Sequence, residues 1–171
     1  MSGLLKKKNS YVWTEDHQAE FVRLKELLTS EPLVQPFDPN LKTELYTDAS
    51  KLNGLGFALI QKEPTGRPRL IQCGSCLLSP AEKNYAVVEL EVLAAAYAMN
   101  KARFYLDGID HFDLFVDHRP LVGLFEKSLV DIDNSRLFRI CLKTTFFNFT
   151  VIWKSGKNYC IVDVFLRFFV F

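Results

Sequence analysis

Hydrophobic positions in the first half of the chain form short runs that are typical of β-strands. Two such runs, 45–47 and 55–60, are separated by a polar turn that contains glycine, which predicts a β-hairpin. A second turn, 64–66, precedes another strand pattern over 69–77. We therefore expect three consecutive antiparallel strands.

The rest of the chain alternates between helical and strand patterns. Ser79 and Pro80 predict the start of a long helix that runs to Tyr105, with Val92 and Met99 on its apolar side. The elements expected after it are a strand at 112–116, helices at 120–125 and 134–147, a strand at 149–153 and a final apolar helix after a loop at 154–158. This order predicts an α/β fold, a five-stranded mixed sheet with helices packed on it.

The N-terminal part has a different pattern. Residues 13–29 predict a helix with Thr14 as its N-cap, and the proline-containing stretch 33–40 predicts an extended connector. A boundary near this point divides the chain into a connecting segment, 1–41, and a folded domain, 42–171.

Composition and charge exclude several classes of protein. The 171 residues are 49% apolar, enough for a core, and 21 basic against 20 acidic side chains give a net charge of +1. No global attraction to nucleic acid or to an anionic membrane follows, so any polyanion must be bound by local patches. The N-terminal lysines precede no long apolar region, and the apolar run 159–171 contains Asp163 and Arg167. We expect no signal peptide and no membrane contact, and hence an intracellular protein, cytoplasmic or nuclear.

Cysteines offer one alternative metal chemistry. The first pair has the two-residue gap of a zinc site, but the second pair lacks it, and positions three apart on a strand point to opposite faces. Reduced thiols are therefore expected at Cys73, Cys76, Cys141 and Cys160.

Isolated carboxylates stand where the surrounding pattern is apolar or where a predicted strand ends. They are Asp48, Asp117 and Asp163, with either Glu89 or Glu91 from the long helix as a fourth, because periodicity does not choose between the two. A buried carboxylate must be paired, protonated or bound to a cation.

Ordinary roles compete with a chemical one at each position. Asp48 and Asp117 suit turns, and Asp163 can pair with Arg167 along a helix. Taken together, however, the acids would meet beside one another in such a sheet. Clustered carboxylates suit Mg²⁺ or Mn²⁺, and two such ions can activate water against a phosphodiester.

Several short groups of residues occur in the order and spacing of a known family. They are 45–50 with Gly54 and Gly56, 71–79, Ala81, Glu82, Asn84, Tyr85, Glu89, Glu91, Leu93, Ala94, Arg103, Tyr105, Leu106, Gly108, Asp117, His118, Pro120, Leu121, 135–137, Gly156, Asp163 and Arg167. Through them the chain resembles the ribonuclease H domain of reverse transcriptases from gypsy-type retrotransposons with long terminal repeats. Residues 4–41 are similar to the segment that joins polymerase and nuclease in such proteins.

The resemblance implies a ribonuclease H-like fold and a metal-dependent endoribonuclease. Its implied catalytic and metal-binding residues are Asp48, Glu91, Asp117 and Asp163, with Glu91 preferred to Glu89 because the family's glutamate is the second of the pair. The implied reaction is hydrolysis of the RNA strand of an RNA–DNA hybrid with two Mg²⁺ or Mn²⁺ ions. The expected partners are the hybrid and the polymerase part of a Pol polyprotein. No polymerase motif is recognised in this sequence.

Departures from the family pattern suggest a second interpretation. Val116 replaces a common threonine, and Tyr159, Val162 and Leu166 make the surroundings of Asp163 bulkier and more apolar. The alternative is a catalytically impaired relic, or a non-catalytic fragment that binds nucleic acid or protein. An integrase or transposase of the same broad fold is disfavoured, because those enzymes carry a glutamate where this chain has its last aspartate.

Overall fold

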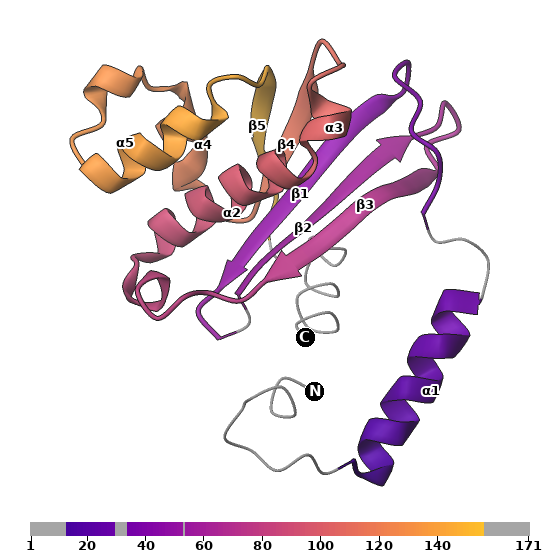
Figure 1. Ribbon diagram of the computed structural model, residues 1–171. Helices are drawn as coiled ribbons and strands as arrows, with labels where there is room; N and C mark the ends of the chain where they lie inside the picture. Colours follow the sequence, from indigo (N-terminus) through magenta and orange to yellow (C-terminus); the bar gives the residue numbers. More distant parts are fainter. Residues whose placement is uncertain (1–12, 30–33, 53, 156–171) are drawn as a thin grey trace. The chain divides into compact units, whose positions relative to one another are not determined.

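The computed structural model describes residues 13–29, 34–52 and 54–155. The chain divides into two compact units, of which the first ends at Gln35 and the second begins at Pro36. The first contains helix α1 (Glu15–Thr29), drawn in indigo in Figure 1. The Thr14 hydroxyl accepts a hydrogen bond from the His17 N–H at 3.4 Å, which confirms the predicted N-cap. The assignment of 1–41 as a connecting segment stays a prediction.

Five strands of the second unit form one mixed sheet in the order β3-β2-β1-β4-β5. Their bounds are β1 (Lys42–Ser50), β2 (Gly54–Lys62), β3 (Pro68–Cys76), β4 (Phe112–Val116) and β5 (Phe149–Trp153). The first three strands pair antiparallel, whereas β4 lies parallel to both β1 and β5. The predicted five-stranded mixed sheet is confirmed.

The first two strands are longer than their apolar runs predicted, because polar residues extend the pairing. β1 and β2 pair along their whole length, from Lys42↔Lys62 to Ser50↔Gly54. The buried Gln61 side chain donates to the Thr43 hydroxyl at 3.1 Å. Such partners within the sheet allow polar side chains to be buried in a strand.

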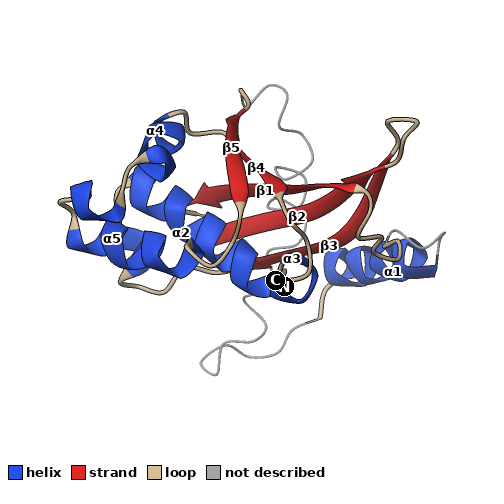
Figure 2. Ribbon diagram, turned by 90° about the horizontal axis from the view of Figure 1, so that it is seen from above, coloured by secondary structure: helices blue, strands red, loops and turns tan. Residues whose placement is uncertain are grey.

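Helices α2 (Val87–Lys101), α4 (Pro120–Glu126) and α5 (Ser135–Cys141) pack on one face of the sheet (Figures 1 and 2). α2 lies against β1 and β2, and its Val92 and Met99 are fully buried, as their helical spacing predicted. The core on this face combines Leu45, Phe57, Leu59, Leu114 and Val116 of the strands with Ala95 of α2, Leu121 of α4 and Ile140 of α5.

The predicted helix from Pro80 to Tyr105 is wrong in its extent. It is divided into a 3-10 turn η1 (Glu82–Asn84), α2 and a short α3 (Arg103–Leu106), with Tyr85 and Ala86 extended between the first two. Ser79 caps only the 3-10 turn, where its hydroxyl accepts from the Glu82 N–H at 3.3 Å. A local capping signal cannot show where the following helix restarts, because that depends on packing.

The predicted helix over 134–147 is also shorter. It consists of α5, with Asn134 as its N-cap, and the 3-10 turn η3 (Leu142–Thr144). A further 3-10 turn, η2 (Leu129–Asp131), precedes it. The predicted final helix lies outside the described residues. None of the described helices is long and apolar enough to cross a membrane.

Two glycines allow a prediction about the hairpin turns. Gly54 and Gly66 both have positive φ angles, +96° and +83°, but a Cβ at Gly54 would overlap the Cys76 carbonyl oxygen, whereas a Cβ at Gly66 meets nothing within 4 Å. We expect G66A to lower the free energy of unfolding by about 1 kcal/mol through backbone strain, and G54A by at least about 2 kcal/mol. Urea denaturation of both variants tests this difference, and equal losses would contradict it.

Candidate metal centre

The parallel pairing of β1 and β4 brings two aspartates to the same edge of the sheet. The paired register ends at Tyr46↔Phe115. Asp48 and Asp117 each lie two residues beyond that last pair. Asp117 directly follows β4, whereas β1 continues to Ser50 in its pairing with β2, so the prediction that Asp48 ends its strand is wrong. Strand pairing therefore sets their proximity, although 69 positions separate them in the sequence (117 − 48 = 69).

Helix α2 adds Glu91 to this pair. One carboxylate oxygen from each of Asp48, Glu91 and Asp117 lies within 4.8 Å of the others. Asp48 and Asp117 are partly exposed, whereas Glu91 is 3% exposed. The structure thus brings together three of the four predicted carboxylates at one place that solvent can reach. Their role as metal ligands stays a prediction.

Burial and neighbouring charges raise the pKa values of carboxylates in the cluster. Burial, followed by the negative charges of Asp117 and Asp48, raises the pKa of Glu91 to about 9, against a smaller opposing effect of the Ala49 N–H. Burial also raises the pKa of Asp117, and the neighbouring His118 partly offsets that shift. Glu91 Oε2 is buried and accepts no hydrogen bond from the described residues. A buried carboxylate oxygen without a donor is the group that a cation would satisfy.

Two hydrogen bonds from the end of β5 hold the backbone at Asp117 and at the residue before it. The Trp153 indole N–H donates to the Asp117 carbonyl oxygen at 3.0 Å, and the Lys154 N–H donates to the Val116 carbonyl oxygen at 2.9 Å. These bonds hold the main chain at Asp117 without involving its carboxylate. No pattern in the sequence indicates this role of Trp153, which is predicted only as a strand residue.

The structure distinguishes the two glutamates that periodicity left open. Glu89 accepts two hydrogen bonds from Arg136 Nη1, both at 3.0 Å, and one from the Ala86 N–H at 2.9 Å. Burial raises the pKa of Glu89, but the bonds from Ala86, Arg136 and Asn134 outweigh burial and hold the pKa below its ordinary value. Glu89 is therefore a paired carboxylate directed to α5, and Glu91 is the one at the cluster.

The fourth predicted residue, Asp163, lies outside the described residues, as do the neighbouring substitutions at Tyr159, Val162 and Leu166. The described part of the centre therefore consists of three carboxylates. The two cysteines with the spacing of a zinc site do not share an environment. Cys73 and Cys76 both lie on β3 but pack in different apolar clusters.

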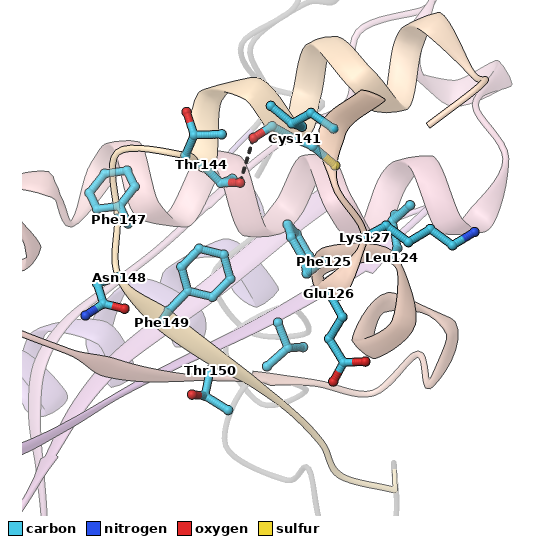
Figure 3. A pocket seen from close by; sticks show the side chains of 13 residues that line it. Leu124, Phe125, Glu126, Lys127, Cys141, Thr144, Phe147, Asn148, Phe149 and Thr150 are labelled. Carbon is cyan, nitrogen blue, oxygen red and sulfur yellow. Dashed lines mark hydrogen bonds between the residues drawn. The ribbon is translucent and has the colours of Figure 1, made fainter. Parts of the chain in front are cut away.

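A hollow of about 470 Å³ lies between α4, η3 and β5, away from the acids (Figure 3). Phe125 and Phe149 line it, and the Thr144 hydroxyl donates to the Cys141 carbonyl oxygen at 2.7 Å on its rim. It contains none of the three clustered carboxylates. The hollow is therefore separate from the carboxylate cluster.

Known proteins with similar folds share this architecture. A ribonuclease H1 from Halobacterium salinarum matches 72% of this chain and 92% of its own length, with a TM-score of 0.51 and 19% identity. A foamy viral protease-reverse transcriptase in complex with an RNA/DNA hybrid matches 86% of this chain and 20% of its own length, with a TM-score of 0.55 and 14% identity. These similarities show that the fold is ribonuclease H-like, as expected.

Sequence comparison gives the family. The Tf2-3 transposon polyprotein of Schizosaccharomyces pombe is 32% identical over 168 residues, which are 98% of this chain and 12% of that polyprotein. The chain thus spans about an eighth of the length of the polyprotein that it matches. The family described as an RNase H-like domain found in reverse transcriptase matches residues 13–114. The chain therefore belongs to the RNase H-like domains of reverse transcriptases.

Proposed function

We propose that the chain is a metal-dependent ribonuclease H that hydrolyses the RNA strand of RNA–DNA hybrids. The observation that carries the proposal is the convergence of Asp48, Glu91 and Asp117 within 4.8 Å. Membership of the reverse-transcriptase family and the similarity to a reverse transcriptase with a bound RNA/DNA hybrid support the choice of substrate.

The residues of the centre fit Mg²⁺ or Mn²⁺. The cluster offers only carboxylate oxygens, the ligand type that these hard cations prefer. The buried Glu91 Oε2 without a hydrogen-bond donor and the raised pKa of Glu91 both fit a site that binds a cation. In the proposed enzyme Asp48, Glu91, Asp117 and the predicted Asp163 hold two such ions.

Two divalent ions held by these residues would supply an activated water and stabilise the leaving oxygen of the phosphodiester. The protein's own contribution is to hold the three carboxylates close together. Glu91 must release its proton when a cation binds, because the neutral acid is a poor ligand. The bonds from Trp153 and Lys154 to the main chain around Asp117 keep that ligand in place during the reaction.

The proposal places the chain within a larger retrotransposon Pol polyprotein. Its similarity to the Tf2-3 polyprotein, of which it spans 12%, supports this origin. Residues 1–41 would then connect the nuclease to a preceding polymerase. The net charge of +1 agrees with a domain that shares its nucleic-acid binding with other parts of a longer chain.

The first test is cleavage of a labelled RNA–DNA hybrid in Mg²⁺ or Mn²⁺. We expect D48N to lower the cleavage rate at least about 100-fold, because it removes one charged ligand of the cluster. D110N, the same change at an exposed aspartate before β4, should retain the wild-type rate. A folded wild-type protein that binds divalent ions but cuts no hybrid would contradict catalysis and favour the impaired relic.

The second test is the pH dependence of stability without divalent ions. The folded protein retains the Glu91 proton up to a pKa of about 9, whereas the ordinary value is 4.5, so the folded state binds more protons between these values. The free energy of unfolding should therefore fall as the pH rises through this window. E91Q has no proton to lose there, and we expect it to exceed the wild type by about 1–3 kcal/mol at pH 8. The control E126Q should follow the wild-type curve in urea denaturation, and an E91Q curve parallel to the wild type would refute the expectation.

The third test is stabilisation by the ions themselves. Mg²⁺ or Mn²⁺ should raise the melting temperature, since a ligand that binds only the folded state adds about 2.7 kcal/mol at 100 times its dissociation constant. The increase should be larger at pH 8 than at pH 6, because binding requires an ionised Glu91. Thermal melts of the wild type, D48N and D110N measure it, and D48N should lose most of the shift. Equal shifts in all three proteins would place the ion elsewhere.

A further inference from the structure

The N-termini of α2 and α5 are joined by a polar network around Glu89. Arg136, in the first turn of α5, donates to both Glu89 oxygens at 3.0 Å, and the Asn134 side-chain amide donates to Glu89 Oε1 at 3.2 Å. Asn134 also caps α5, because its side-chain oxygen accepts from the Arg136 N–H at 2.9 Å. One carboxylate thus connects the starts of two helices.

Glu89 also stabilises the start of α2. Ala86 is the N-cap residue and makes no side-chain capping bond. The Glu89 carboxylate accepts from the Ala86 N–H at 2.9 Å, which is the N3-to-N-cap half of a capping box, and its charge is favourable at a helix N-terminus. The start of α2 therefore depends on where the Glu89 side chain is held.

Arg136, which donates to Glu89, is itself packed on an aromatic ring. The Arg136 guanidinium lies 4.2 Å from the centre of the Tyr85 ring, which belongs to the extended link before α2. The Glu89 side chain is 6% exposed and that of Arg136 is 44% exposed. A buried carboxylate that accepts from a guanidinium packed on an aromatic ring, from an amide and from a backbone N–H has little freedom to move.

Glu91 has much weaker support of its own. It lies two residues after Glu89, and at about 100° per residue the two side chains leave the helix on roughly opposite sides. One faces α5 and the other faces Asp48 and Asp117, which repel it when it is ionised. The Ala49 N–H favours its charged form, but its Oε2 accepts no hydrogen bond from the described part of the chain. The position of Glu91 therefore depends mainly on the helix that carries it.

We propose that Arg136, with Asn134 and through Glu89, is a positioning residue that sets the rotation and the start of α2, so that Glu91 stays at the carboxylate cluster. This inference rests on the proposed function, because it concerns the same centre. It gives the Glu89–Arg136 pair an indirect role in metal binding, because Glu89 leaves α2 on the side away from the cluster.

The test compares metal affinity in the whole chain by calorimetric titration with Mn²⁺, at a temperature where each variant is folded. R136M should raise the dissociation constant roughly tenfold, in the range found when residues that orient metal ligands are removed. R136K keeps the charge but loses the planar guanidinium that packs on the Tyr85 ring, and it should recover only part of the affinity. The matched control is R103M, which breaks the exposed 2.8 Å pair between Arg103 of α3 and Asp107 and should leave the dissociation constant within about twofold of the wild type.

A second variant separates positioning from stability. R136M alone leaves a buried charge unpaired and lowers stability, whereas E89Q/R136M removes the charge and retains an oxygen for the Ala86 N–H. We expect the double variant to regain stability but to bind Mn²⁺ several-fold more weakly than the wild type. Wild-type affinity in folded R136M or in E89Q/R136M would overturn the inference while the proposed function stands. A wild-type protein that binds no Mn²⁺ would overturn both.

Discussion

The mutual repulsion of three carboxylates is the constraint on which the arrangement of this domain depends. Asp48, Glu91 and Asp117 come within 4.8 Å of one another, and Glu91 is almost completely removed from water. Such a cluster is unfavourable by itself, so the rest of the fold must supply the free energy that keeps it together. That free energy comes from ordinary packing: Leu45 and Leu114 on the strands and Val92 on α2 are fully buried within two or three positions of the acids.

The two neighbouring glutamates of α2 show how environment decides the role of one residue type. Glu89 is buried with a guanidinium, an amide and a backbone donor, and its pKa lies below the ordinary value. Glu91 is buried with two other acids, and its pKa is raised to about 9. A paired buried carboxylate serves the architecture, whereas an unpaired one among like charges is typical of a functional site. The difference lies entirely in what faces each side of the helix.

Much of the scaffold could be predicted because its signals are local. The strand Phe112–Val116 is a short apolar run that ends at a charged residue, and β5 is bounded equally clearly. Boundaries were wrong where polar residues entered a strand, as at Thr43 and Gln61, because their partners lie on the neighbouring strand. The long predicted helix was divided at Tyr85 and Ala86, whose backbone is extended, and the Tyr85 ring there contacts Arg136 of α5, a residue distant in the sequence.

The sequence by itself determined the order of elements, the mixed sheet and the set of candidate acids, since apolar periodicity, turn residues and family motifs are all written along the chain. Periodicity left Glu89 and Glu91 open, and the family resemblance favoured Glu91; the tertiary structure shows that Glu91 faces the aspartates while Glu89 pairs with α5. Only the tertiary structure revealed that Trp153 anchors the backbone of Asp117. Both facts concern residues that are distant in sequence and adjacent in space. Parallel strand pairing and helix rotation create that adjacency, and neither is encoded in any single stretch of residues.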